Sequence, residues 1–274
     1  MAFEDPYDVP AAPRPPTLPE LTHAEVEATF ETTAGALLRA AGQGPAHAYV
    51  QRLGVEVPLG LRRWYVGADY EFAAGDGKEG RFEVAGGNVV VDGRTLWATA
   101  TGLAFGGGLG LALPTATFQP GSGGELLAQH VATLRPWDVS FFVPNVFGVR
   151  PFVDVRAVDG PFVVQFRQGL DVTSTNLSFA DPHVYATAGV YFGWRMTAHV
   201  AWGLEAFETY AVDVPGVADD ARATFVASPS VRLVLPWIQP AVSVFTGIGK
   251  PFESTTDSIW GFRLAITFVY RGDR

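Results

Sequence analysis

Apolar and charged residues alternate one by one along the stretch 149–174, and a turn divides this stretch into two arms. One face of the arms carries Val149, Val153, Val155, Phe162, Val164, Phe166 and Leu170. The opposite face carries Arg150, Asp154, Arg156, Arg167 and Asp171. Between the arms stands Asp159-Gly160, a dipeptide that favours tight hairpin turns. A period of two residues on both sides of such a turn predicts a β-hairpin.

This alternation by itself leaves two surroundings open for the hairpin. In a small soluble sandwich, the apolar face would cover a core and the charges would face water. In a membrane barrel, the apolar face would touch lipid and the charges would line a closed interior. The other segments of the chain decide between these two surroundings.

The same pattern returns along the chain in segments separated by turns and loops. The expected strands cover 25–31, 52–57, 63–72, 89–101, 103–114, 149–157, 162–173, 183–195, 199–207, 225–235, 242–245 and 260–270. The phase is unclear in 89–101, and one face of 103–114 consists mainly of glycines. Every second link is only a few residues, and the others are mostly longer and polar. A barrel with an even strand number requires this alternation, so we predict an all-β fold, a transmembrane antiparallel up-and-down barrel of about 12 strands.

The composition agrees with contact between protein and lipid. Hydrophobic residues make up 48% of the 274 residues and charged residues 17%, whereas soluble proteins carry roughly 25% charged residues. No stretch reaches the roughly 18 consecutive apolar residues of a membrane helix. The net charge of −9 excludes a nucleic-acid partner, since no basic stripe is present to neutralise phosphates. Cysteine is absent, which excludes disulfides and thiol chemistry.

Aromatic residues mark the expected boundary of the bilayer. Five tryptophans fall close to the predicted short turns, namely Trp64, Trp97, Trp194, Trp202 and Trp237. Transmembrane barrels carry such aromatic girdles at the membrane interface. The residues that we expect to face lipid or to form the girdle are Trp64, Trp194, Trp202, Trp260, Phe262, Phe268 and Tyr270.

The chain divides into a proline-rich extension at 1–21, the barrel at 22–271 and a short tail at 272–274. The start of the chain lacks the basic and apolar regions of a signal peptide, so we expect that an exported protein has had its signal removed. Within the barrel, a long extracellular loop is expected at about 117–147, including a run that favours a short helix. Its aromatic residues Trp137, Phe141, Phe142 and Phe147 suit either contact with a surface assembly or a constriction folded inward.

Three runs of sequence resemble a known group of proteins. These runs are GLAFGGGLGLALPT, HVAWGLEAF and SPSVRLVLPWIQPAVSV. Over roughly residues 60–271 the chain resembles the outer-membrane proteins of the meta-pathway phenol-degradation type, which are similar to porin-like transporters of Gram-negative bacteria. The resemblance implies a twelve-stranded outer-membrane barrel that passes small organic compounds. The final strand, which ends at Phe268 and Tyr270, is similar to the signal read by the barrel-assembly machinery.

The polar faces of the strands collect charges of both signs. The residues expected to line the interior are Arg63, Asp69, Glu71, Arg150, Asp154, Arg156, Arg167, Asp171, Glu205, Arg232 and Arg263. Paired across neighbouring strands, these side chains can neutralise one another and stiffen the wall. Two interpretations stay open: an ion-pair network that fills a narrow barrel, or a pore that conducts or guides a ligand. A barrel of this size lies between filled and open ones, so strand number does not decide.

We expect a passive channel or transporter for small molecules, including hydrophobic or aromatic ones. The alternative is a plugged structural barrel that anchors or joins an envelope-spanning or surface assembly. Catalysis has two candidate bases, His183 and His199, but both are expected to point inward, away from bilayer lipid, so no enzyme activity is expected. No cluster has zinc-site spacing, and no cofactor is expected. The expected location is the outer membrane, with lipid, lipopolysaccharide, the assembly machinery and envelope proteins as partners.

Overall fold

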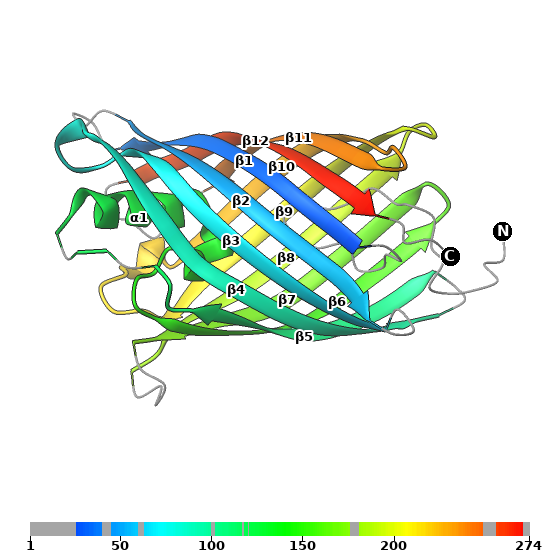
Figure 1. The fold of residues 1–274 in the computed structure, drawn as a ribbon, viewed down its shortest axis with the longest axis horizontal. Helices are drawn as coiled ribbons and strands as arrows, with labels where there is room; N and C mark the ends of the chain where they lie inside the picture. The colour runs from blue at the N-terminus through cyan, green and yellow to red at the C-terminus, as the bar shows by residue number, and fades with distance from the viewer. Residues whose placement is uncertain are drawn as a thin grey trace.

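The computed structural model describes residues 26–39, 45–59, 63–99, 102–116, 118–119, 121–175, 181–248 and 256–270. These residues form one sheet that closes on itself (Figure 1), and the predicted twelve-stranded up-and-down barrel is confirmed. The strands are β1 (Val26–Arg39), β2 (Ala46–Leu59), β3 (Trp64–Asp76), β4 (Phe82–Ala98), β5 (Leu103–Leu113), β6 (Phe147–Asp159), β7 (Phe162–Ser174), β8 (His183–Arg195), β9 (Val200–Asp213), β10 (Ala223–Leu233), β11 (Ile238–Ile248) and β12 (Thr256–Tyr270). Each strand pairs antiparallel with its neighbours in sequence, and β12 pairs with β1 to close the barrel. The extension at 1–21 and the tail at 272–274 lie outside the described residues.

The two ends of the barrel differ in the length of their connections. At the short-turn end, where β1 begins and β12 stops, the link between β6 and β7 is only Gly160-Pro161. At the long-loop end, the link between β5 and β6 covers 114–146. The predicted alternation of short and long links therefore holds around the barrel. In outer-membrane barrels the short turns lie on the periplasmic side.

The outer surface of the wall is a belt of exposed apolar side chains. The predicted lipid-facing residues Trp64, Trp194, Trp260, Phe262, Phe268 and Tyr270 are all exposed, and Trp202 is half-buried. Trp97 and Trp237 are also exposed and lie next to the short turns, so the short-turn end carries an aromatic girdle. A soluble monomer rarely exposes an apolar patch above a few hundred Å². The surrounding of the outer face is therefore lipid.

A bulge in strand β4 explains why the sequence does not show clearly which of its residues face inward. Before Gly87 the odd-numbered residues of β4 face inward, whereas from Asn88 onward the even-numbered ones do. The pairing of β3 with β4 shifts at this point, which is the geometry of a β-bulge. The strand also begins at Phe82, so the link from β3 is shorter than the polar run suggests. The bulge turns the Asn88 side chain into the lumen.

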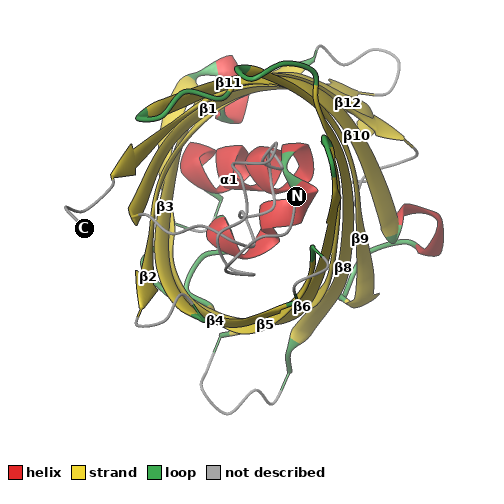
Figure 2. Ribbon diagram, turned by 90° about the vertical axis from the view of Figure 1, so that its right-hand side faces the viewer, coloured by secondary structure: helices red, strands yellow, loops and turns green. Residues whose placement is uncertain are grey.

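The link between β5 and β6 folds back into the barrel instead of extending away from it (Figures 1 and 2). It forms α1 (Gly123–Leu134) and the 3-10 helix η2 (Pro136–Phe141), which together we call the plug. Ser122 is the N-cap of α1, because its hydroxyl accepts a hydrogen bond from the Glu125 backbone N–H at 3.2 Å. Two short 3-10 turns, η1 (Lys78–Gly80) and η3 (Asp219–Ala221), lie in loops at the long-loop end. No helix in the described part of the chain combines the length and apolarity needed to cross a membrane.

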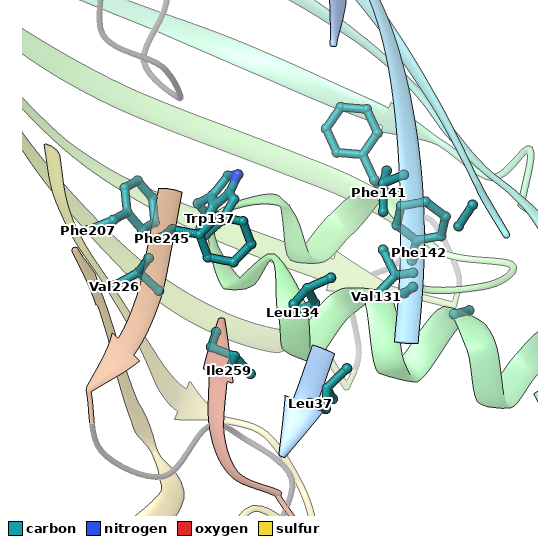
Figure 3. Close-up of a cluster of buried hydrophobic side chains, with 14 of the residues drawn as sticks. Leu37, Val131, Leu134, Trp137, Phe141, Phe142, Phe207, Val226, Phe245 and Ile259 are labelled. Carbon is teal, nitrogen blue, oxygen red and sulfur yellow. The ribbon is translucent and has the colours of Figure 1, made fainter. Parts of the chain in front are cut away.

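The plug packs in the half of the lumen near the long-loop end, where the inward-facing wall residues are apolar (Figure 3). These wall residues include Leu37, Ala48, Val50, Ala73, Val226, Phe245 and Ile259. Against them lie Leu127, Val131 and Leu134 of α1. Position 35 holds glycine, and a Cβ there would lie 2.7 Å from a methyl carbon of Leu134. The wall is thus shaped to receive α1, and the constriction that was one of two alternatives for this loop is the arrangement found.

Candidate functional site

The plug is joined to the wall by Arg135, which stands at the end of α1 and is almost fully buried. Its guanidinium lies 3.1 Å from Glu31 Oε1 of β1 and donates to Glu71 Oε1 of β3 at 2.9 Å. It also donates to Asp138 Oδ2 of η2 at 2.6 Å and to the Thr33 hydroxyl at 3.0 Å. One cation therefore links the plug to two wall strands through Glu31 and Glu71, and it joins α1 to η2 through Asp138. We call Arg135, Glu31, Glu71 and Asp138 the latch.

The charges of the latch stabilise one another. Burial would raise the pKa of Asp138, but the positive charges of Arg135, Arg52 and Arg150 outweigh it and hold that pKa below its ordinary value. Burial also opposes the charged form of Arg135, yet the surrounding carboxylates raise its pKa. Asp138 and Arg135 are therefore both charged at neutral pH, and their attraction acts in a space with little water.

A second set of contacts holds η2 and the segments beside it. The Asn88 amide donates to the carbonyl oxygens of Ser140 and Val143, each at 2.8 Å, and its Oδ1 accepts from the Ala116 N–H at 2.8 Å. Asn88 is fully buried and uses three of its four hydrogen-bonding positions on backbone groups of the β5–β6 link, one of them in η2. From β9, the Thr209 hydroxyl donates to the Pro136 carbonyl at 2.7 Å. The bulge in β4 thus supplies an anchor for the plug backbone.

Trp137 anchors the plug on the opposite side of the lumen. Its ring meets Phe245 of β11 edge-on at 5.4 Å and Phe207 of β9 at 6.3 Å between centroids. The Arg263 guanidinium lies 5.2 Å from the Trp137 ring. Figure 3 shows the indole beside Phe207 and above Phe245, with its nitrogen turned away from both rings. Edge-to-face aromatic contacts of this type add about 0.5–1.5 kcal/mol each beyond burial.

Between the plug and the short-turn end, the lumen contains a cavity of about 200 Å³. At the end nearer the plug, the cavity is bounded by Trp137, Asp138 and Phe141. Toward the short-turn end, its lining extends to Glu27 and Glu56, which lie near the short-turn ends of β1 and β2. The lining is a mixture of charged side chains, glycines and a few aromatic rings. Such a lining suits water and small polar solutes.

Most of the residues predicted to line the interior do face inward, many as ion pairs between strands. Arg167 donates two hydrogen bonds to Asp154, at 2.6 and 2.7 Å, and these residues stand directly opposite each other on β7 and β6. Arg150 lies 3.1 Å from Asp171, and Arg263 lies 3.4 Å from Glu205. The inward-facing residues are Asp69, Glu71, Arg150, Asp154, Arg156, Arg167, Asp171, Glu205, Arg232 and Arg263. Filling by ion pairs and a remaining cavity therefore occur together.

Arg63 differs from the prediction that it lines the interior. Strand β3 begins at Trp64, so Arg63 belongs to the turn between β2 and β3, where it is exposed. The alternation of the strand cannot be extended across its end, because a turn no longer follows the period of two. Arg63 is therefore placed at the short-turn end of the molecule and outside the wall.

The two histidines considered for catalysis do not come together. His183 is the first residue of β8, at the long-loop end, and His199 lies in the turn before β9, at the short-turn end. A shared base and nucleophile arrangement would need them, or one of them and a serine, within hydrogen-bonding reach. Within the described residues, no group of three His, Asp or Glu side chains is arranged to hold a metal ion.

Sequence reasoning missed the latch cation and the Asn88 anchor. Arg135 and Asp138 stand in the run LRPWDVSFFV, where two charges are surrounded by apolar and aromatic residues. This composition is unusual for a solvated loop, and it could have predicted that the two charged residues are buried. For Asn88 no comparable sign exists, because its role depends on the bulge.

By sequence, the chain matches no protein-family model and no curated protein. By structure, it resembles an outer membrane channel from Pseudomonas putida F1, with a TM-score of 0.64 and 13% identity, over 89% of this chain and 93% of that chain. The beta domain of the Bordetella autotransporter BrkA gives 0.51 and 12% identity, over 90% and 100%. LpxR from Salmonella typhimurium gives 0.50 and 11%, over 88% and 100%. The chain therefore has the fold of an outer-membrane β-barrel, which sits in a lipid bilayer.

Proposed function

We propose that this protein is an outer-membrane channel for small molecules whose passage is limited by the plug. The observation that carries the proposal is the lumen itself, in which a cavity lined by charges ends at a plug held by non-covalent contacts. A barrel that only needed filling could have continued its side-chain network through this space. The similarity to an outer membrane channel supports the proposal at the level of fold.

The plug supports a restricted channel rather than a wide one. The wall around α1 and η2 is apolar, and the latch and Asn88 fix the plug in place. Solutes would pass either through space beside the plug or when the plug leaves its seat. We therefore expect small and infrequent conductance steps from the intact chain. The proposal assigns the protein no chemical reaction.

The resemblance to the meta-pathway phenol-degradation group adds a proposal about cargo. Molecules with an aromatic ring could contact Trp137, Phe141, Phe152 and Phe207, which line the cavity. A structural barrel that anchors an assembly is the second candidate, favoured by the dense packing of the plug against the wall. This alternative predicts a barrel that carries no current.

Removal of the plug separates these two functions. Ala112 and Gly148 face each other in the ladder of β5 and β6, so residues 114–146 can be replaced by a short Asn-Gly turn that closes a hairpin. We expect this variant to give larger and steadier single-channel currents in planar bilayers than the intact chain. Heat-modifiable mobility on gels controls for folding. An intact, folded chain that carries no current while the variant conducts would overturn the channel proposal and favour the structural barrel.

A further inference from the structure

The cavity below the plug carries more negative than positive side chains. Seven carboxylate residues line it, namely Glu27, Glu31, Glu56, Asp69, Asp92, Asp138 and Asp171. The cationic residues in the lining are Arg52, Arg150, Arg167 and Arg232. Seven minus four leaves three more carboxylates than arginines in the lining itself. From behind the lining, Arg135 pairs with Glu31 and Asp138, and Arg94 pairs with Glu56. A narrow space with such a surplus between low-dielectric walls concentrates cations and repels anions.

The arginines of the lining are bound to groups of the protein. Arg52 donates to Asp69 at 2.9 Å, Arg150 pairs with Asp171 at 3.1 Å, and Arg167 is held by two bonds to Asp154. An anion in the cavity would have to compete with these carboxylates for each guanidinium. Because paired charges of opposite sign offset each other, the arginines do little to attract anions.

Asp92 is the carboxylate best placed to meet a solute. Among the described residues it accepts no hydrogen bond and forms no ion pair, and it is half-buried in the lining. It stands opposite Gly67 of β3, which in turn stands opposite Glu56 of β2. A Cβ at Gly67 would lie 2.5 Å from Asp92 Oδ1, so the glycine leaves room for this carboxylate. Asp92, Glu56 and Glu27 thus follow one row across the wall, with Gly67 within it.

A second observation points to a positively charged or hydrogen-donating occupant. Asp171 is 1% exposed and lines the same cavity. Its Oδ2 accepts from Ser140 at 3.2 Å and faces Arg150, whereas its Oδ1 is buried with no protein partner in the described residues. A buried carboxylate oxygen without a donor is costly. This oxygen therefore favours a donor or a cation in the adjoining cavity.

We infer that the channel passes small cations in preference to anions, and that Asp92 is a residue that determines this preference. The inference rests on the proposed channel function and adds its charge selectivity. Potassium, sodium and small ammonium compounds are the chemical class favoured by carboxylates without fixed partners. Neutral molecules would be affected little by the surplus charge.

The test is the reversal potential of the full-length protein in planar bilayers under a tenfold potassium chloride gradient. We expect potassium to be favoured over chloride by about fivefold or more at low salt. Asp92→Asn keeps the shape of the side chain and should reduce this ratio by about half. Glu79→Gln serves as the control, since Glu79 is exposed in η1 at the long-loop end and should leave the ratio unchanged.

The outcomes of this experiment test separately the channel function, the preference for cations and the role of Asp92. If openings of the intact chain are too rare, Asn88→Ala loosens the plug without changing any charge. Silence of both proteins with folded barrels would refute the channel function, and the inference with it. Conductance with a ratio near one, or with chloride favoured, would overturn the inference alone. A cation preference that Asp92→Asn does not change would overturn the role of Asp92.

Discussion

The latch makes the plug sensitive to a single substitution, Arg135→Met. Methionine has a similar length but no charge, so Glu31 and Glu71 of the wall would keep their buried carboxylates without the cation. Both side chains are nearly inaccessible, at 3% and 0% exposure. Removing one partner of a buried ion pair typically costs about 3–5 kcal/mol. Water reaches these carboxylates when the plug leaves, so the cost falls on the docked state.

This free-energy change translates into a measurable opening of the plug. Since about 1.36 kcal/mol corresponds to a factor of ten, about 3–5 kcal/mol should raise the undocked fraction by a factor of about 2 × 10² to 5 × 10³. The chain contains no cysteine, so Val131→Cys provides a single reporter at a fully buried position of α1. A maleimide reagent reaches this thiol only when α1 leaves the wall. If undocking is brief and reversible, the labelling rate is proportional to the undocked fraction.

The matched control removes an arginine from an exposed ion pair. Arg81 lies 3.6 Å from Glu79, and both side chains are mostly exposed, so Arg81→Met should leave the labelling rate unchanged. Adding Glu31→Gln to Arg135→Met should slow labelling again, because one uncompensated buried carboxylate is removed with it. If the labelling rate after Arg135→Met stays within about twofold of the unsubstituted reporter, the latch does not hold the plug.

Three further predictions concern the same plug. Asn88→Ala removes three hydrogen bonds to backbone groups of the link that carries the plug and should raise the reporter labelling rate by about tenfold to a hundredfold. The pKa of Asp138 lies below its ordinary value of 3.8, so its stabilisation is present above that pH, and conductance should rise as the pH falls further. Constant conductance down to pH ~2 would contradict this. A Cβ at Gly148 would lie 3.6 Å from Ser140 Cβ, so Ser140→Cys with Gly148→Cys, and Ala112→Gly to relieve a 2.9 Å contact, should form a disulfide. The oxidised variant should conduct less than the intact chain, and reduction of the disulfide should return its conductance to the level of the intact chain. Equal currents in the oxidised and reduced states would show that η2 does not move.

The barrel could be predicted from sequence because its rules are local. A period of two residues separates the lipid face from the lumen, and link lengths reveal the closure. This reasoning also placed Asp154 and Arg167 on the lumen side, where they pair directly across β6 and β7. It failed where the period is interrupted, at the bulge between Gly87 and Asn88 and at the turn that contains Arg63.

The plug could not be derived in the same way, because its contacts join distant parts of the chain. Arg135 meets Glu71 across 64 residues of sequence and Thr33 across 102. Local patterns show a helix, a proline and buried-looking charges, but they do not show which carboxylates lie opposite. The run at 34–38 of β1 was missed for the same reason. Its inward residues pack against α1 and are therefore apolar, so the alternation of apolar and polar residues ends before them.

The lumen has two halves with opposite chemistry, and this division ties the plug to the wall. Near the long-loop end the inward residues Leu37, Val50 and Ile259 are apolar, whereas near the short-turn end they are charged or polar. A water-filled lumen would gain nothing from the apolar half, because exposing it costs about 25 cal/mol per Å². The apolar part of the wall is therefore stable only while the plug covers it. When the plug leaves, a solute from outside would meet an apolar vestibule before the carboxylates, so the two halves would act in sequence on whatever passes.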